Sequence, residues 1–251
     1  MRLRGLQRVT LLDFPGKVAC TVFTVGCNFR CPFCHNASLV TQEAESIASS
    51  DDAPRNTSIA APSSSSDTTG DLSTEDFFAF LASRKGKLDG VCVSGGEPLL
   101  QPDIRAFIVR IREMGFAVKL DTNGSFPDVL EGLLAEGLLD YVAMDIKSSP
   151  EHYAAAVGLA EAPLDRIGRS VQLLLTSGVP FEFRTTVVEE LHSAEDFRRI
   201  GEWIDGAPRY YLQEFTDSGD TLCRGCHPMS RERIEEAARF VSPHIAAVGI
   251  R

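Results

Sequence analysis

Residues 18–36 read VACTVFTVGCNFRCPFCHN, an apolar run that ends in three closely spaced cysteines. The run from 18 to 25 is rich in Val, Phe and Thr and almost continuously apolar, which is typical of a strand buried on both faces. Cys27, Cys31 and Cys34 follow it with the spacing C-x3-C-x2-C. A tight loop with this spacing can direct three sulfurs at one point, so we expect a metal centre at the end of this first strand.

The pattern of a strand followed by a helix recurs along the chain. The strands are predicted at residues 18–25, 90–94, 117–121, 141–145, 181–188 and 210–215. The helices are predicted at residues 74–85, 102–114, 127–136, 164–177, 194–204 and 230–241. Such a succession of βα units predicts an α/β fold with a parallel sheet. A partial (β/α)6 barrel and an open doubly wound sheet both fit the pattern, and in either one ligands bind at the carboxyl ends of the strands.

The chain is predicted to form a single domain over residues 1–251 that carries an insertion at 44–70. Its length suits one α/β domain, and 43% hydrophobic with 24% charged residues can supply a core. Residues 44–70 are dominated by Ser, Ala, Asp, Thr and Pro, including a run of serines at 63–66. Because such a segment buries too little apolar surface to offset its ordering entropy, we expect it to be a disordered insertion.

Charge and composition limit the cellular locations and the binding partners that we expect for the protein. With a net charge of −10, the protein is expected to bind neither nucleic acid nor membrane. No apolar run approaches the ~18 residues of a membrane helix. The apolar stretch of an export signal is interrupted by Gln7, Arg8 and Asp13, so a cytoplasmic location is expected. In that reducing compartment the seven cysteines are expected to serve metal ligation or catalysis rather than disulfides.

Three kinds of metal centre compete for the cysteine loop. A [4Fe–4S] cluster has four irons that usually take one thiolate each, so three cysteines would leave one iron open to a cofactor or substrate. A structural zinc site would need a fourth ligand, which His35, Cys223 or Cys226 could supply. Residues 31–35 also spell C-x-x-C-H, the haem attachment pattern, but that pattern requires export and leaves Cys27 unexplained.

Polar or charged residues stand at the ends of the next predicted strands. Residues 94–98 read SGGEP, where paired glycines let a ligand approach the backbone and Glu97 could meet an ammonium group. Residues 121–124 read DTNG, and their polar side chains stand where a parallel sheet binds ligands. Asn-Gly is also a common turn sequence, so a turn that leads into a helix fits these residues as well. Asp145 and Lys147 end the following strand, and both charges need a ligand or each other.

The later part of the chain adds further candidates. Arg184 interrupts an apolar strand, where its guanidinium could clamp a carboxylate or form an internal salt bridge. Gln213 and Glu214 on the last strand are weaker candidates. Residues 223–227 read CRGCH. A redox pair, a metal site that includes His227 or another protein, and a pair without function all fit that segment.

The sequence around the first cysteines resembles that of a known family. Residues 5–7 (GLQ), 12–17 (LDFPGK) and 26–36 (GCNFRCPFCHN) are similar to the activating proteins of anaerobic ribonucleoside-triphosphate reductase, which belong to the radical S-adenosylmethionine superfamily. Pyruvate formate-lyase activating enzymes are near relatives. The resemblance covers nearly the whole chain apart from the Ser-rich insertion. It implies an α/β fold of the radical SAM type, a partial (β/α)6 barrel with parallel strands.

The resemblance also implies a cofactor site. Cys27, Cys31 and Cys34 would hold a [4Fe–4S] cluster, and S-adenosyl-L-methionine would bind the open iron. Residues 95–97 are similar to the Gly-Gly-Glu motif of the superfamily, which receives the methionine amino group. The expected cofactor-binding residues are Phe33, Cys34, His35, Gly95, Gly96, Glu97, Asp121, Asn123, Asp145, Lys147 and Arg184.

The implied protein is an enzyme, a radical SAM oxidoreductase. Flavodoxin or ferredoxin would supply one electron, S-adenosylmethionine would be cleaved reductively, and the resulting radical would take a hydrogen atom from a backbone glycine of a partner. The expected partner is a glycyl radical enzyme, foremost an anaerobic ribonucleotide reductase, with a pyruvate formate-lyase-type enzyme as an alternative. A radical enzyme acting on a small molecule, such as a deazapurine synthase-like enzyme, and a non-enzymatic zinc-binding module remain open.

Overall fold

The computed structural model describes residues 1–40, 68–217, 219 and 221–251. Its strands form one sheet in the order β3-β1-β2-β4-β5-β6-β7-β8-β9. β1 pairs antiparallel with β2 and β3, and all the other neighbours in the sheet are parallel. The strands are β1 Leu3–Thr10, β2 Ala19–Thr24, β3 Thr68–Leu72, β4 Gly90–Gly95, β5 Ala117–Thr122, β6 Tyr141–Asp145, β7 Phe181–Val187, β8 Tyr210–Glu214 and β9 Val248–Ile250.

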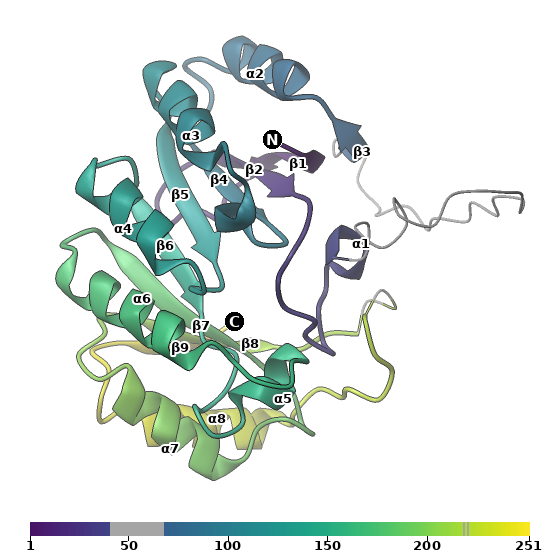
Figure 1. The fold of residues 1–251 in the computed structure, drawn as a ribbon. Coiled ribbons are helices and arrows are strands. Elements are labelled where there is room, and N and C mark those ends of the chain that lie inside the picture. The colour runs from purple at the N-terminus through teal and green to yellow at the C-terminus, as the bar shows by residue number, and fades with distance from the viewer. Residues whose placement is uncertain (41–67, 218, 220) are drawn as a thin grey trace, which may run out of the picture.

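The long helices cover one face of this sheet. Figure 1 shows α2, α3, α4, α6, α7 and α8 along the outer face of a curved sheet, while α1 and α5 lie beside the loops at the other face. The helices are α1 Ala37–Val40, α2 Thr74–Ser83, α3 Ile104–Glu113, α4 Pro127–Ala135, α5 Tyr153–Val157, α6 Leu164–Thr176, α7 Ala194–Trp203 and α8 Arg231–Val241, with a short 3-10 helix at Pro98–Leu100. The prediction of an α/β fold with parallel strands is therefore confirmed. The curved sheet, with β3 and β9 at its two edges and its long helices on one side, has the form of a partial barrel rather than of a doubly wound sheet.

The six predicted strands correspond to β2 and to β4 through β8, and the six predicted helices correspond to α2, α3, α4, α6, α7 and α8. Sequence patterns missed β1, β3 and β9. β1 was missed because Arg4, Gln7 and Arg8 interrupt its apolar residues, as is usual in an antiparallel strand that is partly exposed. β9 spans only Val248–Ile250, which is too short for a periodic signal.

Alternation along the strands separates an apolar face from a polar one. Successive side chains of a strand point to opposite faces of the sheet. In β5, Val118 and Leu120 belong to the hydrophobic core under the helices, whereas Lys119 and Asp121 form an ion pair with each other. In β7, Phe183 is likewise a core residue, and its neighbour Arg184 lies among polar groups. The inner face of the curved sheet is therefore polar toward the carboxyl ends of β5 and β7, where the site described below lies, whereas Phe14, Ala19 and Tyr141 form a small apolar cluster nearer the amino ends of the strands.

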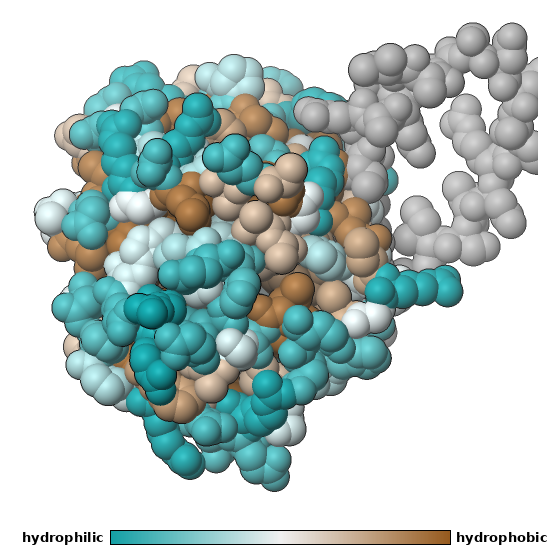
Figure 2. Space-filling view, turned by 60° about the horizontal axis from the view of Figure 1, so that its bottom comes forward, coloured by the Kyte–Doolittle hydropathy of each residue, from teal (hydrophilic) through white to brown (hydrophobic). Residues whose placement is uncertain are grey.

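The predicted insertion lies largely outside the described residues. Residues 44–67 are not described, but Thr68–Gly70, which the sequence also assigned to the insertion, belong to β3. β3 pairs with β1 because the chain returns to the sheet before α2 begins. In the parts of the chain that the structure describes, no helix is both long and apolar enough to cross a membrane. On the face drawn in Figure 2, hydrophilic residues cover most of the described surface and hydrophobic residues form separate patches.

Candidate active site at the carboxyl ends of the strands

A cavity of about 210 Å³ opens at the carboxyl ends of the parallel strands. The loop after β2 and the ends of β4 through β8 supply its walls, as expected for ligand sites in parallel sheets. All of the predicted site residues except Glu97 line it. They are Cys27, Cys31, Phe33, Cys34, His35, Gly95, Gly96, Asp121, Asn123, Asp145, Lys147 and Arg184.

Backbone hydrogen bonds fix the cysteine loop to three parts of the molecule. The Gly26 amide donates to the Leu39 carbonyl of α1 at 2.8 Å, and the Gly26 carbonyl accepts from the Glu97 amide at 2.8 Å. The Arg30 amide donates to the Val157 carbonyl at the end of α5, also at 2.8 Å. The loop is therefore held by the core rather than exposed as a free segment.

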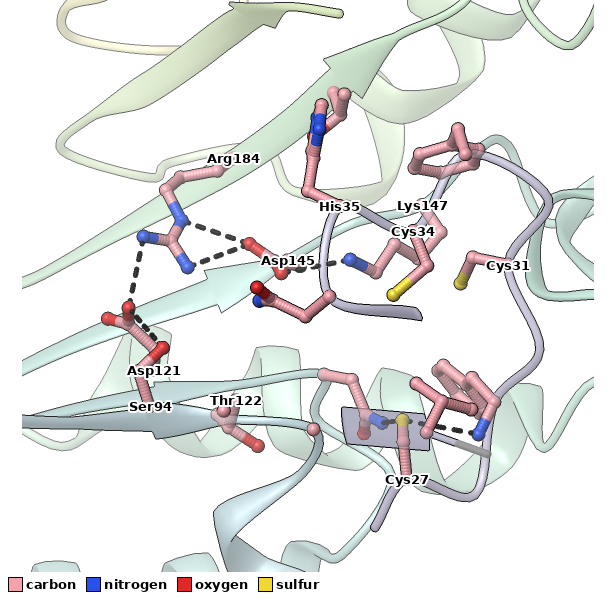
Figure 3. A pocket seen from close by; sticks show the side chains of 18 of the residues that line it. Cys27, Cys31, Cys34, His35, Ser94, Asp121, Thr122, Asp145, Lys147 and Arg184 are labelled. Atoms are coloured by element: carbon pink, nitrogen blue, oxygen red, sulfur yellow. Dashed lines mark hydrogen bonds and ion pairs between the residues drawn. The ribbon is translucent and has the colours of Figure 1, made fainter. Parts of the chain in front are cut away.

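Inside this loop three thiols face one space. Figure 3 shows the sulfurs of Cys27, Cys31 and Cys34 directed into the same part of the cavity. All three cysteines are free thiols, and Cys31 is buried. Burial raises the pKa of Cys27 to about 11 and that of Cys31 to about 12, so both are neutral until a metal binds.

The donor set fits an iron–sulfur cluster with an incomplete set of protein ligands. Iron–sulfur clusters bind cysteine thiolates, and no other cysteine lines the described walls of the cavity. Among the described residues, no three His, Cys, Asp or Glu side chains are grouped so that they could hold a single metal ion. Three thiolates with no further lining cysteine suit a cluster in which one iron keeps no protein ligand.

Glu97 lies behind the cavity wall rather than in it. Its side chain is fully buried, and its carboxylate accepts hydrogen bonds from the Leu99 amide at 3.0 Å, the Thr122 hydroxyl at 2.8 Å and the Asn123 amide at 2.6 Å. The carboxylate is therefore engaged by three donors of the protein itself and does not line the cavity. It joins the loop after β4 to the end of β5. Burial is the main reason why the pKa of Glu97 rises to about 7.

The paired glycines serve the close approach of two backbones. A Cβ on Gly95, which has a φ of +131°, would lie 2.3 Å from the Thr24 nitrogen. A Cβ on Gly96 would lie 2.0 Å from the Gly26 carbonyl oxygen. Both glycines also line the cavity, so β4 can end directly beside the cysteine loop only because these positions carry no side chain.

Charged side chains from β5, β6 and β7 form a chain of ion pairs along the cavity. Arg184 donates from Nε to Asp145 Oδ1 at 2.9 Å and lies 3.5 Å, through Nη1, from Asp121 Oδ2. Asp145 Oδ2 also pairs with Lys147 Nζ at 2.9 Å, and Asp121 pairs with the buried Lys119. Figure 3 shows Arg184 between the two carboxylates. For Asp145, Lys147 and Arg184 the sequence left a ligand and an internal ion pair open, and the structure has them in ion pairs that border the cavity.

These contacts keep both carboxylates ionised. Burial alone would raise the pKa of Asp145, but Arg184 and Lys147 outweigh it and lower the pKa to about 2. Burial also opposes the charge of Asp121, and Arg184 and Lys119 again lower the pKa below its ordinary value. This chain of ion pairs contains three cationic and two anionic side chains, so the ion-pair chain carries one excess positive charge beside the cavity.

Asn123, which directly follows β5, connects the end of that strand to the cysteine loop. Its Nδ2 lies 3.9 Å from Cys27 Sγ and donates to Asn28 Oδ1 at 3.0 Å, while its Oδ1 accepts from the Ser125 hydroxyl at 2.6 Å. The side chain is therefore fixed on two sides. Asn28 was not predicted, although its place directly after Cys27 could have indicated it.

His35 and Phe33 line the cavity at the end of the cysteine loop. The His35 ring packs against Phe215 with the ring centroids 5.3 Å apart, and Phe33 is buried. Burial and the charge of Lys147 lower the pKa of His35, so its ring is neutral near pH 7. The cavity also includes residues that the sequence analysis did not select as site residues: Phe29, Asn36, Val40, Ser94, Thr122 and Thr186. The weaker candidate Gln213 lines the cavity too.

Comparison of the sequence with those of known proteins identifies the family of this chain. A sequence model described as the Radical SAM superfamily matches residues 21–204. A proposed glycyl-radical enzyme activating enzyme of Methanocaldococcus jannaschii, MJ1227, is 29% identical over 254 residues, which cover 98% of this chain and 94% of the relative. The pyruvate formate-lyase-activating enzyme of Clostridium pasteurianum is 27% identical over 210 residues, covering 81% and 76%.

A solved structure supports the fold. A domain of pyruvate-formate lyase-activating enzyme from Bacteroides vulgatus superposes with a TM-score of 0.52. The two share 16% sequence identity over 64% of this chain and 98% of that domain. At this level of identity the likeness concerns the arrangement of helices and strands.

Proposed function

Since this chain belongs to the radical SAM superfamily and is closely similar to glycyl-radical enzyme activating enzymes, we propose that it generates a glycyl radical on an anaerobic ribonucleoside-triphosphate reductase. The observation that carries the proposal is the cavity in which three cysteine sulfurs face a row of ion-paired side chains. The choice of partner is supported by the text of residues 5–7, 12–17 and 26–36.

Cys27, Cys31 and Cys34 would hold a [4Fe–4S] cluster, and S-adenosylmethionine would fill the neighbouring part of the cavity. When bound, these two groups supply a one-electron cleavage and a radical that abstracts hydrogen. Flavodoxin or ferredoxin would provide the electron. The chain's own residues bind, orient and shield these groups.

The excess positive charge of the ion-pair chain suits the carboxylate of the cofactor. Arg184 and Lys147 present N–H donors to the cavity and are already ordered by Asp121 and Asp145. A ligand carboxylate can therefore bind without ordering long, flexible side chains, which lowers the entropic cost of binding. Because these donors lie in a largely buried site, their interaction with a carboxylate is also stronger than it would be in water.

Glu97 acts in this proposal through the residues that it holds. It fixes the Thr122 hydroxyl and the Asn123 amide, and Asn123 in turn contacts the cysteine loop. Glu97 is therefore a positioning residue for the cavity wall. The part assigned to its carboxylate by the resemblance, binding the methionine amino group, would fall to other polar groups at the ends of β4 and β5.

A backbone glycine is a suitable target for this site. The hydrogen on a glycine Cα is easily removed because the flanking amide nitrogen and carbonyl share the resulting unpaired electron. Glycine also has no side chain to block its approach to a small cavity. The partner would present such a glycine on a segment that enters the cavity.

Electron paramagnetic resonance tests the proposal. Anaerobically reconstituted protein, a reductant and S-adenosylmethionine are mixed with an anaerobic ribonucleotide reductase or, in a parallel arm, a pyruvate formate-lyase. We expect a glycyl radical signal on the reductase that is absent with Cys31→Ser. A signal on the lyase alone would transfer the proposal to that partner. Cleavage of S-adenosylmethionine without any glycyl radical, accompanied by turnover of a deazapurine precursor, would replace it with the small-molecule function.

A further inference from the structure

Cys223 and Cys226 are the two cysteines that lie outside both the cavity and the sheet. They belong to the segment between β8 and α8, and both are free thiols. Cys223 is exposed, whereas Cys226 is half-buried and packs against the hydrophobic core. The proposed activation of a partner does not use either thiol.

Among the described residues around this pair, none completes a metal site. His227 follows directly, but its amide donates to Glu190 Oε2 at 2.9 Å and its Nδ1 lies 2.5 Å from Glu190 Oε1. The imidazole is therefore engaged by a carboxylate. In the described part of the chain, no group of three His, Cys, Asp or Glu side chains is arranged to hold a metal ion.

The segment that carries the pair is anchored to the cysteine loop. The Cys223 amide donates to the Pro32 carbonyl at 3.1 Å, and Pro32 lies between Cys31 and Cys34. At the start of the segment, Phe215 packs on His35. Figure 1 shows the yellow-green segment passing beside the purple one that follows β2.

The other end of the segment is anchored to the end of β7. The Glu189 amide donates to the His227 carbonyl at 3.0 Å, and Val188 forms an isolated β-bridge with Pro228. Because residues 227 and 228 are held at the end of β7, a change in the backbone at Cys223 is expected to shift the contact between Cys223 and the cysteine loop.

The two thiols differ in the way that thiol–disulfide exchange requires. The exposed Cys223 can reach a disulfide in solution, and Cys226 follows it with only Arg224 and Gly225 between them. Burial, and then the charges of Glu190 and Cys223, raise the pKa of Cys226. Half-burial and a raised pKa make Cys226 slow to attack a solution disulfide, while the C-x-x-C spacing is that of dithiols that close a disulfide ring.

We propose that Cys223 and Cys226 form a redox-active dithiol that exchanges with disulfides, with Cys223 as the attacking and Cys226 as the resolving thiol. The Cys223 thiolate attacks one sulfur of the disulfide, whose S–S bond breaks, and one thiolate leaves. Cys226 then attacks the Cys223 sulfur, closes the intramolecular disulfide and releases the second thiolate. The two protein thiols lose two electrons and two protons, which the disulfide gains as it becomes two thiols.

Closing this ring is also transmitted to the cysteine loop. A disulfide fixes its two sulfurs about 2.05 Å apart and restricts the dihedral angles on either side. The turn through Gly225 must then adjust, together with the Cys223 amide that donates to Pro32. The exchange step itself goes beyond the proposed function and needs no S-adenosylmethionine or partner. The transmitted effect rests on the proposed role of the cysteine loop.

Tryptic mapping of the metal-loaded protein tests the exchange. Trypsin cleaves after Arg224 and so places Cys223 and Cys226 on two peptides, residues 210–224 and 225–231. After anaerobic incubation with oxidised glutathione and alkylation, we expect these peptides to remain joined until a reductant is added. Cys226→Ser should accumulate glutathione on Cys223, and Cys223→Ser should stay unmodified. The buried Cys20 and Cys92 serve as internal controls that must remain unreacted.

Two results would overturn the proposal. The first is that the joined peptides form only from protein unfolded in urea and not from the folded, metal-loaded chain. The second is that Cys226→Ser carries no glutathione on Cys223. For transmission to the cysteine loop, amide hydrogen exchange at Cys223 and over residues 29–34 should differ between the dithiol and disulfide forms. Equal exchange rates would overturn that part, and none of these readouts depends on glycyl radical formation.

Discussion

At the scale of single residues, Arg184 is the side chain on which the ion-pair chain depends. Its guanidinium reaches both Asp121 and Asp145, which a lysine ammonium cannot do with the same fork of donors. We expect Arg184→Lys to weaken S-adenosylmethionine binding about tenfold, or about 1.4 kcal/mol, because a lysine ammonium cannot make the bidentate contact of a guanidinium with the carboxylate of the cofactor. Isothermal titration with the reconstituted protein measures this. Arg105→Lys, which alters an exposed pair with Glu136, is the matched control and should bind normally.

Glu97 makes a second prediction at this scale, on stability. Its pKa of about 7 in the folded protein exceeds the ordinary value of 4.5, so folding takes up a proton between these values. Its contribution to stability is present below pH 4.5 and is lost as the pH rises through 7. Raising the pH from about 5 to about 7.5 should destabilise the wild-type apoprotein by about 2 kcal/mol more than Glu97→Gln.

Urea unfolding at the two pH values checks this difference. Asp145 and Asp121 do not interfere, because their pKa values are lowered and lie below the range compared. A wild-type protein and a Glu97→Gln variant whose free energies of unfolding change in parallel with pH would show that Glu97 is ionised in the folded state.

The residues of the site were largely predictable for a simple reason. The ends of parallel strands meet at one edge, so Asp121, Asp145 and Arg184 could be placed together from their strands alone. The direction of Glu97 could not be predicted, because it depends on the amides of the next strand end. Lys119 was missed because a lysine within an apolar strand gives no sign that a carboxylate two residues away will neutralise it.

At the scale of elements, α5 is coupled to the cysteine loop through its last turn. Gly158 ends α5 with a φ of +65°, and a Cβ there would lie 2.2 Å from the Arg30 carbonyl oxygen. Gly158→Ala should therefore displace the loop, and we expect fewer iron and sulfide ions per chain after reconstitution. The strain of the left-handed conformation alone costs about 1 kcal/mol.

Gly178 separates these two effects. It follows α6 with a φ of +72°, and a Cβ added there would have no atom within 4 Å among the described residues. Gly178→Ala should lose about 1 kcal/mol in urea unfolding yet load iron and sulfide like the wild type. Equal loading of both variants would mean that α5 does not position the cysteine loop.

The elements themselves were predictable to different degrees. The strands with helices packed on them, such as β4 and β6, carry nearly continuous apolar runs and were all identified. β1 and β3 form the antiparallel side of the sheet, where polar residues interrupt the apolar ones or the Ser-rich segment leads directly into the strand. Their pairing is decided by tertiary contacts that local sequence does not encode.

At the scale of the whole molecule, one sheet joins the described residues from Leu3 to Ile250. We therefore propose that residues 1–251 form one folding unit, and we expect a single unfolding transition. The fluorescence of Trp203, the only tryptophan, reports on α7, while far-ultraviolet circular dichroism reports on all elements. The two urea curves of the apoprotein should coincide, and separate midpoints would reveal an independent subdomain.

The central claim is that three cysteines hold an iron–sulfur cluster with one iron left for S-adenosylmethionine. Mössbauer spectroscopy of protein reconstituted with ⁵⁷Fe, recorded with and without S-adenosylmethionine, tests it most directly. Because a [4Fe–4S] cluster has four irons and this cavity offers three thiolates, about a quarter of the iron signal should shift when the cofactor binds. An iron signal that S-adenosylmethionine leaves unchanged, or a protein that takes up zinc instead of iron and sulfide, would contradict the account.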